Sequence, residues 1–458
     1  MNKAFYTYPA LILVFSLFGA GVAHAQTSDI SPYSRYGIGD LQDQNSILNF
    51  SMGGTGIAYH NDANVPFFIN LKNPASYAYG FVPSPLSDSS GRQGLKMAVF
   101  EAGLQDNILS LSSSDGQTAN SNNAYLAYLV MNIPVSRHFG LALGLTPVST
   151  EGYNITTNNA VDSDGIPAKT TSEQTTYQGS GGISKVFVGA AYAPVKNLSI
   201  GVNVSYLFGN LTNTEEVNFN NADIFNTLKA ENVGIHSFNA DFGIMYTVNI
   251  GKNMDHPEKN WHITFGATVT PSVNLAANYN VFSVSQDANG NNVDTLQDSG
   301  YVGKIRIPLS YGAGITIKKG NSWTISFDHT VQNWSQFSYF GQTENLTNSY
   351  SYGVGVQYIP NKNFPKAYAE RVHYRIGYSY SLNYLDLNNT PLIDRGFSAG
   401  IGLPIGDLSP DRHPAVLNFA IKVGSMGTTT NNLILQNYVQ FMVGFTFNDH
   451  WFDKHLLY

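Results

Sequence analysis

The chain has 458 residues, no cysteine and a formal net charge of −7, and only 12% of its residues are charged. The absence of cysteine excludes disulfides and thiolate chemistry, and the negative charge argues against a nucleic-acid partner. Low charge, 43 glycines and 28 tyrosines are typical of one large all-β unit whose strands face lipid on one side and a polar lumen on the other.

Residues 1–25 have the pattern of a secretory signal peptide. Lys3 gives a positive start, residues 10–22 are apolar, and Ala23-His24-Ala25 offers small residues before Gln26. An N-terminal membrane anchor is the alternative, but the apolar run is short for a helix of about 20 residues. We therefore predict cleavage and export.

Residues 26–93 are predicted to form an N-terminal hatch or plug segment. Within them, residues 51–78 show neither strand nor helix periodicity and are interrupted by Gly-Gly, Asn-Asp and Asn-Pro turn signals. Pro74 biases Asn73 toward an extended conformation, and the Asn73 amide can bond nearby backbone groups, so we expect a structural role there. Phe67 and Phe68 could line a ligand pocket or pack the segment against the barrel wall, and we favour packing.

Residues 94–447 alternate with a period of two, the pattern of a half-buried strand. Phe419, Ile421 and Val423, for example, alternate with small or polar residues. Fourteen such runs are found, centred near residues 99, 129, 143, 188, 203, 243, 266, 311, 326, 354, 377, 399, 420 and 442. Short and long connections alternate along the chain, as in bacterial outer-membrane barrels.

These runs predict a transmembrane antiparallel β-barrel of about 14 strands, with the hatch inside it. An even strand count returns the C-terminus to the side where the chain entered, so residues 448–458 are predicted to be a periplasmic C-terminal tail. A soluble β-sandwich or propeller is the alternative. It is disfavoured because no second element is long enough to cover the repeated apolar faces.

Several charged residues fall on predicted lumen-facing positions of the strands. They can pair with one another or with the hatch, or a cation among them can neutralise a ligand carboxylate. The candidates for these ligand or lumen roles are Arg306, Arg375, Lys422, Asp241 and Asp328. Pro147 lies in the third run and cannot donate to a strand ladder, so it marks either an ordinary strand end or a kink in the wall.

The sequence does not support catalysis or metal binding. Gly396-Phe397-Ser398-Ala399-Gly400 matches G-x-S-x-G, but that motif works at a strand-to-helix turn, and here it lies within an alternating strand. The histidines show no close ligand spacing. We predict no enzymatic step, no cofactor and no metal.

The hatch region also resembles a known family. Gly53, Gly54 and Gly56, followed by Asn73-Pro74-Ala75, resemble the N-terminal hatch of the FadL/TodX outer-membrane transporters of hydrophobic compounds. Trp334-Ser335 looks like a Trp-Ser pair late in those barrels. SPYSRYGIGD and the terminal NDHWFDKHLLY look like a Bacteroidota branch, which is also similar to PorV-type barrels of the type IX secretion system.

The resemblance implies a fourteen-stranded barrel in the outer membrane of a Gram-negative bacterium, blocked by the hatch. Small hydrophobic compounds, such as long-chain fatty acids or aromatic hydrocarbons, would enter passively and leave sideways into outer-membrane lipid at a kinked strand, for which Pro147 is the candidate. The alternative is a non-transporting barrel that acts as a secretion or assembly partner. Two departures, the inserted VPFFINLK and the residues past Phe447, bear on transport more than on fold.

Overall fold

The computed structural model describes residues 31–61, 68–79, 97–136, 138–160, 172–221, 223–251, 260–320, 322–361, 367–405 and 415–450. The predicted signal peptide and Phe67 lie outside these ranges. In the part of the chain that is described, no helix is both long enough and apolar enough to cross a membrane.

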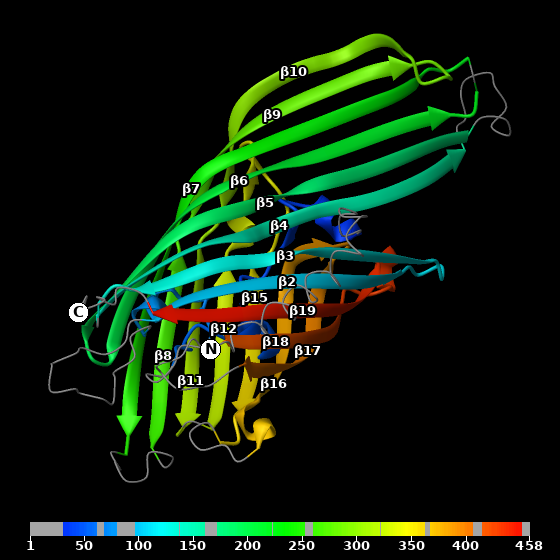
Figure 1. Ribbon diagram of the computed structural model, residues 1–458. Helices are drawn as coiled ribbons and strands as arrows, with labels where there is room; N and C mark the ends of the chain where they lie inside the picture. The colour runs from blue at the N-terminus through cyan, green and yellow to red at the C-terminus, as the bar shows by residue number, and fades with distance from the viewer. Residues whose placement is uncertain are drawn as a thin grey trace, which may run out of the picture.

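The wall of the molecule is one antiparallel sheet (Figure 1). Its long strands are β2 (Met97–Ser112), β3 (Thr118–Pro134), β4 (Phe139–Ala160), β5 (Ser172–Val195), β6 (Leu198–Phe219), β7 (Asn226–Ile250), β8 (Trp261–Thr270), β9 (Val273–Gln286), β10 (Asn292–Ile307), β11 (Ser310–Lys319), β12 (Trp323–Gln332), β15 (Ser349–Tyr358), β16 (His373–Leu387), β17 (Thr390–Ile405), β18 (Ala415–Met426) and β19 (Leu435–His450).

The sheet closes because β19 pairs with β2 along the whole length of both strands. β8 and β9 both pair with β7 and form one interrupted wall strand, and β10 and β11, which pair with β9 and β8, form the next. The wall therefore has fourteen strands, and the predicted closed antiparallel barrel is confirmed.

The two interruptions fall at Pro271 and Pro308 and change which residues face inward. In β8 and β11 the even-numbered residues are the buried ones, such as Thr264 and Thr316. In β9 and β10 the odd-numbered ones are buried, such as Leu275. Proline cannot donate to a ladder, so the strand breaks and resumes one residue out of phase.

This phase change corrects one expectation about the lumen. Arg306 was predicted to face inward, on the assumption that the alternation runs unbroken through Pro308. In the structure Ile305 is fully buried, whereas Arg306 beside it is exposed on the opposite face of β10.

The hydrophobic pattern inverts at the same level of the wall. Below the interruptions the apolar side chains face outward, and on β17 Phe397 is 70% exposed while Ser398 is 5% exposed. Above them the buried positions are apolar, as Val233 and Leu275 illustrate. The lower wall thus follows the rule for a lipid-embedded barrel, and the upper wall that for a protein in water.

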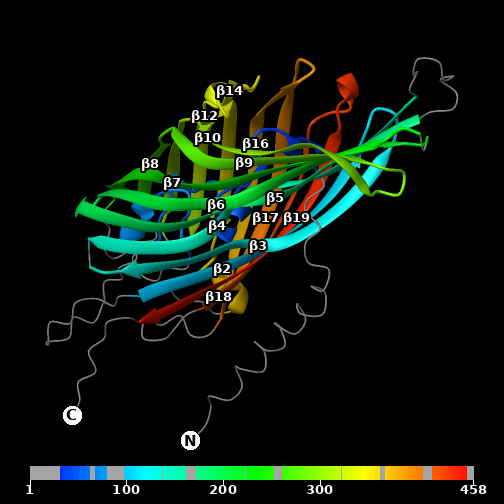
Figure 2. The ribbon, with the colours of Figure 1, turned by 90° about the horizontal axis from the view of Figure 1, so that it is seen from above.

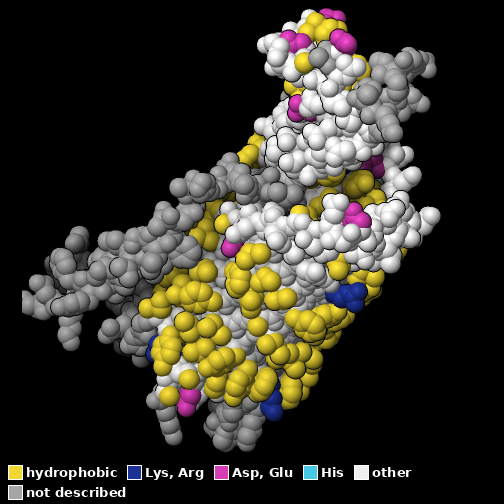
Figure 3. All heavy atoms as spheres, turned by 90° about the vertical axis from the view of Figure 1, so that its right-hand side faces the viewer, with side chains coloured by type: hydrophobic (Ala, Val, Ile, Leu, Met, Phe, Trp, Pro, Cys, Tyr) yellow, Lys and Arg dark blue, Asp and Glu magenta, His cyan; other side chains and the backbone are white. Residues whose placement is uncertain are grey.

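The strands also differ in length around the barrel. β5 and β7 have 24 and 25 residues, whereas β12 and β15 have 10 each. At about 3.3 Å per residue, 10 residues span about 33 Å, close to the hydrocarbon thickness of a bilayer, and 25 residues span about 80 Å. On one side of the barrel, β4, β5, β6, β7, β9 and β10 therefore continue beyond the other strands, and we call this part the projecting sheet (Figure 1). Figure 3 shows apolar side chains covering the lower wall and mostly polar ones on the upper part.

The N-terminal segment (residues 31–79, as far as described) lies within the ring of strands (Figure 2). It forms η2 (Pro32–Arg35), β1 (Asp40–Leu41), α2 (Ile47–Ser51) and η3 (Pro74–Tyr79). Two of these elements divide the inner wall, because α2 contacts β16 to β19 and η3 contacts β3 to β7.

The remaining short elements lie in connections between wall strands. They are η5 (Trp334–Gln336), β13 (Ser338–Tyr339), β14 (Gln342–Thr343), η6 (Tyr368–Arg371) and η7 (Thr430–Asn432). At the end of the chain, β19 runs on to His450 because Asn448 and Asp449 pair with the first residues of β2. The tail expected from residue 448 therefore starts inside the last strand, and residues 451–458 lie outside the described chain.

Inward-facing glycines let the backbone of the N-terminal segment lie directly against the wall. A Cβ on Gly266 would overlap the carbonyl oxygen of Ile57, and one on Gly377 would overlap the backbone of Gly53. Similar contacts hold Pro74 against Gly201. At these positions a side chain larger than that of glycine would overlap the backbone of the N-terminal segment.

We predict that Gly266→Leu destabilises the protein by displacing Ile57. Inserting a bulky side chain into a packed contact typically costs about 1–3 kcal/mol. Ala267→Leu is the matched control, because residue 267 is next along β8 and exposed on the outer face. Urea unfolding followed by tryptophan fluorescence should show a lower midpoint for the first variant only. Equal unfolding midpoints for the two variants would contradict close packing of Ile57 against Gly266.

Candidate functional site

Inward-facing polar side chains of the wall bind the backbone of the N-terminal segment. Buried Asp328 on β12 accepts hydrogen bonds from the N–H groups of Gly56 and Ile57 through one oxygen, at 2.6 and 2.8 Å. Ser398 on β17 accepts one from Gly53 N–H at 3.0 Å. N–H groups that no helix or strand satisfies are therefore paired with the wall.

Glu101 on β2 makes a third attachment. One of its carboxylate oxygens accepts the N–H of Ile69 at 2.7 Å and the other accepts the hydroxyl of Tyr128 at 2.7 Å. Tyr128 also accepts the N–H of Ile47, the first residue of α2, at 3.0 Å. This buried cluster joins both halves of the N-terminal segment to the same part of the wall.

The residues of the predicted hatch motif form the turn after α2 and the start of η3. Gly53 and Gly54 follow α2 with φ of 68° and 78°, which explains the glycine pair, because other residues rarely adopt this conformation. The fully buried Asn73 donates to the carbonyl of Ile57 at 2.7 Å and accepts from the N–H of Ala75 at 3.0 Å, while Pro74 begins η3. Asn73 ties two parts of the segment together.

The predicted cations in the lumen have partners in the wall. Arg375 is buried and donates to Gln357 at 2.8 Å and to Asn418 at 2.9 Å, with His373 Nδ1 at 3.1 Å. The ammonium of Lys422 lies 5.5 Å from the centre of the Tyr438 ring. Their role toward a ligand stays a prediction.

The remaining candidates are a carboxylate and an aromatic ring. Asp241 accepts the hydroxyl of Thr270 at 2.7 Å and lies 3.7 Å from the ammonium of Lys185. Phe68 is buried and packs edge-on against Tyr59, with ring centroids 4.9 Å apart. This contact lies within the N-terminal segment, so packing of Phe67 and Phe68 against the wall stays a prediction.

Sequence reasoning missed two of the wall's contacts with the segment. Lys318, which lies at the end of β11 within a predicted turn, donates to the carbonyl of His60 at 2.7 Å and lies over the Tyr59 ring. Glu101 was not singled out. A carboxylate that alternates with apolar residues near the start of the first wall strand was the signal that could have identified it.

Above these contacts the interior becomes apolar. We call this the apolar layer, a cluster of buried side chains that joins the upper wall to the start of the N-terminal segment. It contains Tyr33, Ile38, Ile183, Leu207, Leu211, Val233, Ile235, Leu275, Ala277, Ile305, Trp334, Phe337, Leu346, Tyr384, Leu385, Leu392 and Leu433. Trp334 of the predicted Trp-Ser pair is fully buried there and stacks on Tyr384 at 4.4 Å.

The wall is split beside this layer, between β3 and β4. Their ladder runs from Pro134–Gly140 only to Leu129–Leu145, although both strands continue. Pro147 lies just above the last pair, and the register of β4 against β5 shifts between Pro147 and Ser149.

The N-terminal segment fills the split. β1 pairs with β4 through Asp40–Thr150 and Leu41–Ser149. Gln44 donates to the carbonyl of Pro147 at 2.7 Å, and Gln42 accepts the hydroxyl of Tyr125 on β3 at 2.9 Å. Side chains of the segment thus bridge two wall strands that do not bond each other at this height.

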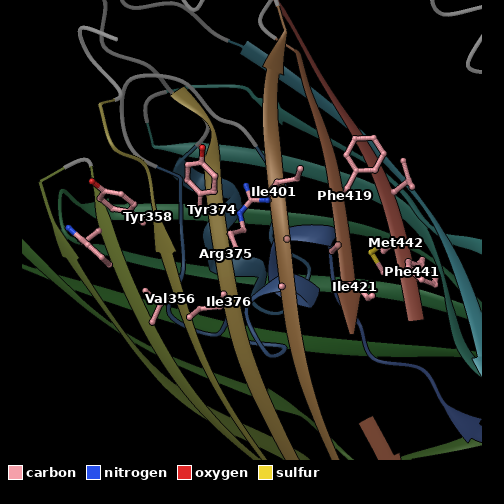
Figure 4. Close-up of a pocket in the computed structure, with 15 residues that line it drawn as sticks. Val356, Tyr358, Tyr374, Arg375, Ile376, Ile401, Phe419, Ile421, Phe441 and Met442 are labelled. Carbon is pink, nitrogen blue, oxygen red and sulfur yellow. The ribbon is translucent and has the colours of Figure 1, made fainter. Parts of the chain in front are cut away.

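One cavity lies on the outer face of the barrel. It is a groove of about 650 Å³ with Ala399 among its lining residues, and Figure 4 shows Tyr374, Ile401 and Phe419 around it. These residues belong to the lipid-facing set, so the groove is part of the lipid contact surface.

A second cavity, of about 290 Å³, is polar and lies over the N-terminal segment. Arg35, Glu151, Glu231, Tyr339 and Glu344 are among its lining residues. Burial raises the pKa of Glu344, which lies in a connection outside the wall strands, although the N–H of Gly37 opposes this shift. No group of three metal-ligating side chains occurs among the described residues.

We predict that Asp328→Ala loosens the N-terminal segment. The change removes a charged acceptor from two buried N–H groups, at a cost of about 2–4 kcal/mol. Hydrogen exchange at Gly56 and Ile57 should accelerate markedly, with a smaller effect for Asp328→Asn. Asp298→Ala, at an exposed position of β10, is the control. Unchanged protection in Asp328→Ala would show that the carboxylate does not hold the segment.

Three solved barrels have a similar fold. The Ralstonia pickettii toluene transporter TbuX has a TM-score of 0.54 at 15% identity, covering 89% of this chain and 99% of that one. The P. putida toluene transporter TodX scores 0.53 at 15% identity, covering 90% and 100%. A Pseudomonas aeruginosa FadL homologue scores 0.52 at 11% identity, covering 89% and 98%. The predicted resemblance to FadL/TodX barrels is thereby confirmed for the fold.

A search of curated proteins found no match. A family model, described as BamG, matches residues 7–457, nearly the whole chain. The chain therefore belongs to the BamG family.

Proposed function

We propose that this protein is a passive channel for small hydrophobic compounds in the outer membrane of a Gram-negative bacterium, with its C-terminus on the periplasmic side. The observation that carries the proposal is the contact between the apolar layer and the split wall. Val148, next to Pro147, packs against that layer at the height where β3 and β4 separate. An apolar compound in the layer would thus be adjacent to a side exit into lipid.

Opening this route requires the start of the N-terminal segment to move. Tyr33 and Ile38 fill part of the apolar layer, and β1 occupies the split. Moving residues 31–41 would open both places together. The contacts of Asp328 and Glu101 hold later residues of the segment, so that part can stay in place as the hatch.

The chemical class of cargo follows from the lining. Long-chain fatty acids and aromatic hydrocarbons are both compatible with an apolar layer, and toluene is named for TbuX and TodX. Passage needs no enzymatic step and no cofactor, because the compound moves down its gradient. Lipid of the outer membrane receives it.

We predict that Pro147→Val slows uptake of an apolar compound severalfold. Valine supplies the N–H that proline lacks and permits the β3–β4 ladder to extend past Leu145. Uptake of radiolabelled toluene and oleate by cells is the measurement. Pro134→Val, at the other end of the same ladder, is the control. Unchanged uptake in Pro147→Val would remove the side exit.

Arg375 tests whether a buried cation receives a ligand carboxylate. Its guanidinium already has Gln357, Asn418 and His373 as neighbours, so we predict that Arg375→Gln leaves oleate affinity unchanged while lowering the unfolding midpoint. Oleate binding to purified protein and urea unfolding are measured together. A selective loss of oleate affinity, with toluene affinity retained, would assign the carboxylate role to Arg375.

A non-transporting barrel that serves as a secretion or assembly partner is the second candidate. The projecting sheet favours it, because the strands on that side extend far beyond the length needed to cross a bilayer. Native mass spectrometry of purified protein separates the two. A fatty-acid-like or aromatic adduct supports the channel, whereas a clean barrel with a stable protein partner supports the alternative.

A further inference from the structure

The projecting sheet ends in an unpaired strand. Along Asn292–Gly303, β10 pairs with β9 on one side, and no described residue pairs with it on the other. The β13–β14 connection pairs with Ile305 and Arg306 and donates the N–H of Phe340 to the carbonyl of Lys304, below this stretch. The side chains from 292 to 302 are exposed, and Val302 is 77% exposed.

The opposite edge of the projecting sheet is β4, and the N-terminal segment pairs with part of it. There the N-terminal segment covers only the lower part of β4, through the β1 pairs and a hydrogen bond from Ser31 N–H to the carbonyl of Gly152, and no described residue pairs with residues 153–160 on that side. The chain thus covers part of one edge with its own residues, and the open stretch of β10, residues 292–303, is longer than that of β4. Unpaired strand edges are sites where another polypeptide can add a strand.

Charge restricts which polypeptide can do so. Asp294 and Asp298 lie on the open strand, and a second copy pairing edge to edge would bring these carboxylates together. The projecting sheet is acidic above its base, where Lys304 and Arg306 lie on β10: among its described residues and tip turns above this level, Lys229 is the one cation, and it is paired with Glu231 at 2.6 Å. Its carboxylates include Glu151, Glu173, Glu215, Glu216, Asp223, Glu231, Asp287, Asp294 and Asp298.

The open strand also offers apolar contacts at its lower end. Tyr301 packs against Phe340 of the β13–β14 hairpin, with ring centroids 5.3 Å apart, yet is itself half exposed. Val302 faces the other side of the sheet. An added strand could therefore place apolar side chains beside both residues and cationic side chains beside the aspartates.

We infer that the Asn292–Gly303 edge of β10 is the docking site for an extended, lysine- or arginine-rich segment of a partner polypeptide, which adds to the projecting sheet as a further strand. Backbone hydrogen bonds provide the attachment, and the carboxylates select a basic segment over an acidic one or a second copy. This inference goes beyond the proposed channel and does not depend on transport.

The test uses full-length protein in detergent and a synthetic octapeptide of alternating lysine and valine. Hydrogen exchange with mass spectrometry should show peptide-dependent protection of backbone amides in 292–303. An octapeptide of alternating glutamate and valine should give none. Equal protection by both peptides, protection confined to other strands, or no protection would overturn the inference.

Charge reversal provides the matched comparison. Asp294→Lys with Asp298→Lys should weaken binding of the lysine–valine peptide at least about tenfold. Asp115→Lys with Asp386→Lys makes the same charge change at exposed positions on other strands and turns, and should leave affinity within about twofold. Equal weakening in both pairs would mean that net charge, rather than the β10 edge, attracts the peptide. Protection of 292–303 by self-association without peptide would also overturn the inference.

Discussion

Side chains alternate between the two faces of a strand, and each wall strand must therefore satisfy two environments with one sequence. Below Pro271 and Pro308 this rule places aromatic and aliphatic residues in lipid and small or polar ones inside. A polar interior cannot be left unpaired without a cost of a few kcal/mol per group. The N-terminal segment meets that demand, because its free N–H groups are donors to the inward carboxylates.

This reciprocity explains why charged residues can stay inside the barrel. Asp328 and Glu101 each accept a backbone N–H of the segment, and Gly266 and Gly377 bring the two backbones close enough for such contacts. The wall and the segment are thus mutually dependent. Without the segment Asp328 would lose both of its donors and Glu101 would keep only the Tyr128 hydroxyl, and the segment without the carboxylates would have unpaired N–H groups.

The sequence was sufficient to predict the features that depend on the two-residue alternation within a strand. All fourteen predicted strand centres fall in the wall strands, and Ser398 lies within an alternating strand as expected. Features that depend on pairing between distant residues could not be predicted. The phase change at Pro308 put Arg306 outside, and the early end of the β3–β4 ladder gave Pro147 its position at a split. Nothing in a single strand records where its neighbour stops pairing.

The inverted pattern above the two prolines has a consequence for how the molecule sits in a bilayer. Moving the barrel inward by one or two residues would bring Lys304 and Arg306, on the outer face of β10, toward hydrocarbon. Moving it outward would expose the aromatic band of the lower wall to water. Both displacements are unfavourable. The level of Pro271 and Pro308 therefore marks the boundary between the lipid-facing and water-exposed parts of the wall, and it fixes how deeply the barrel sits in the bilayer.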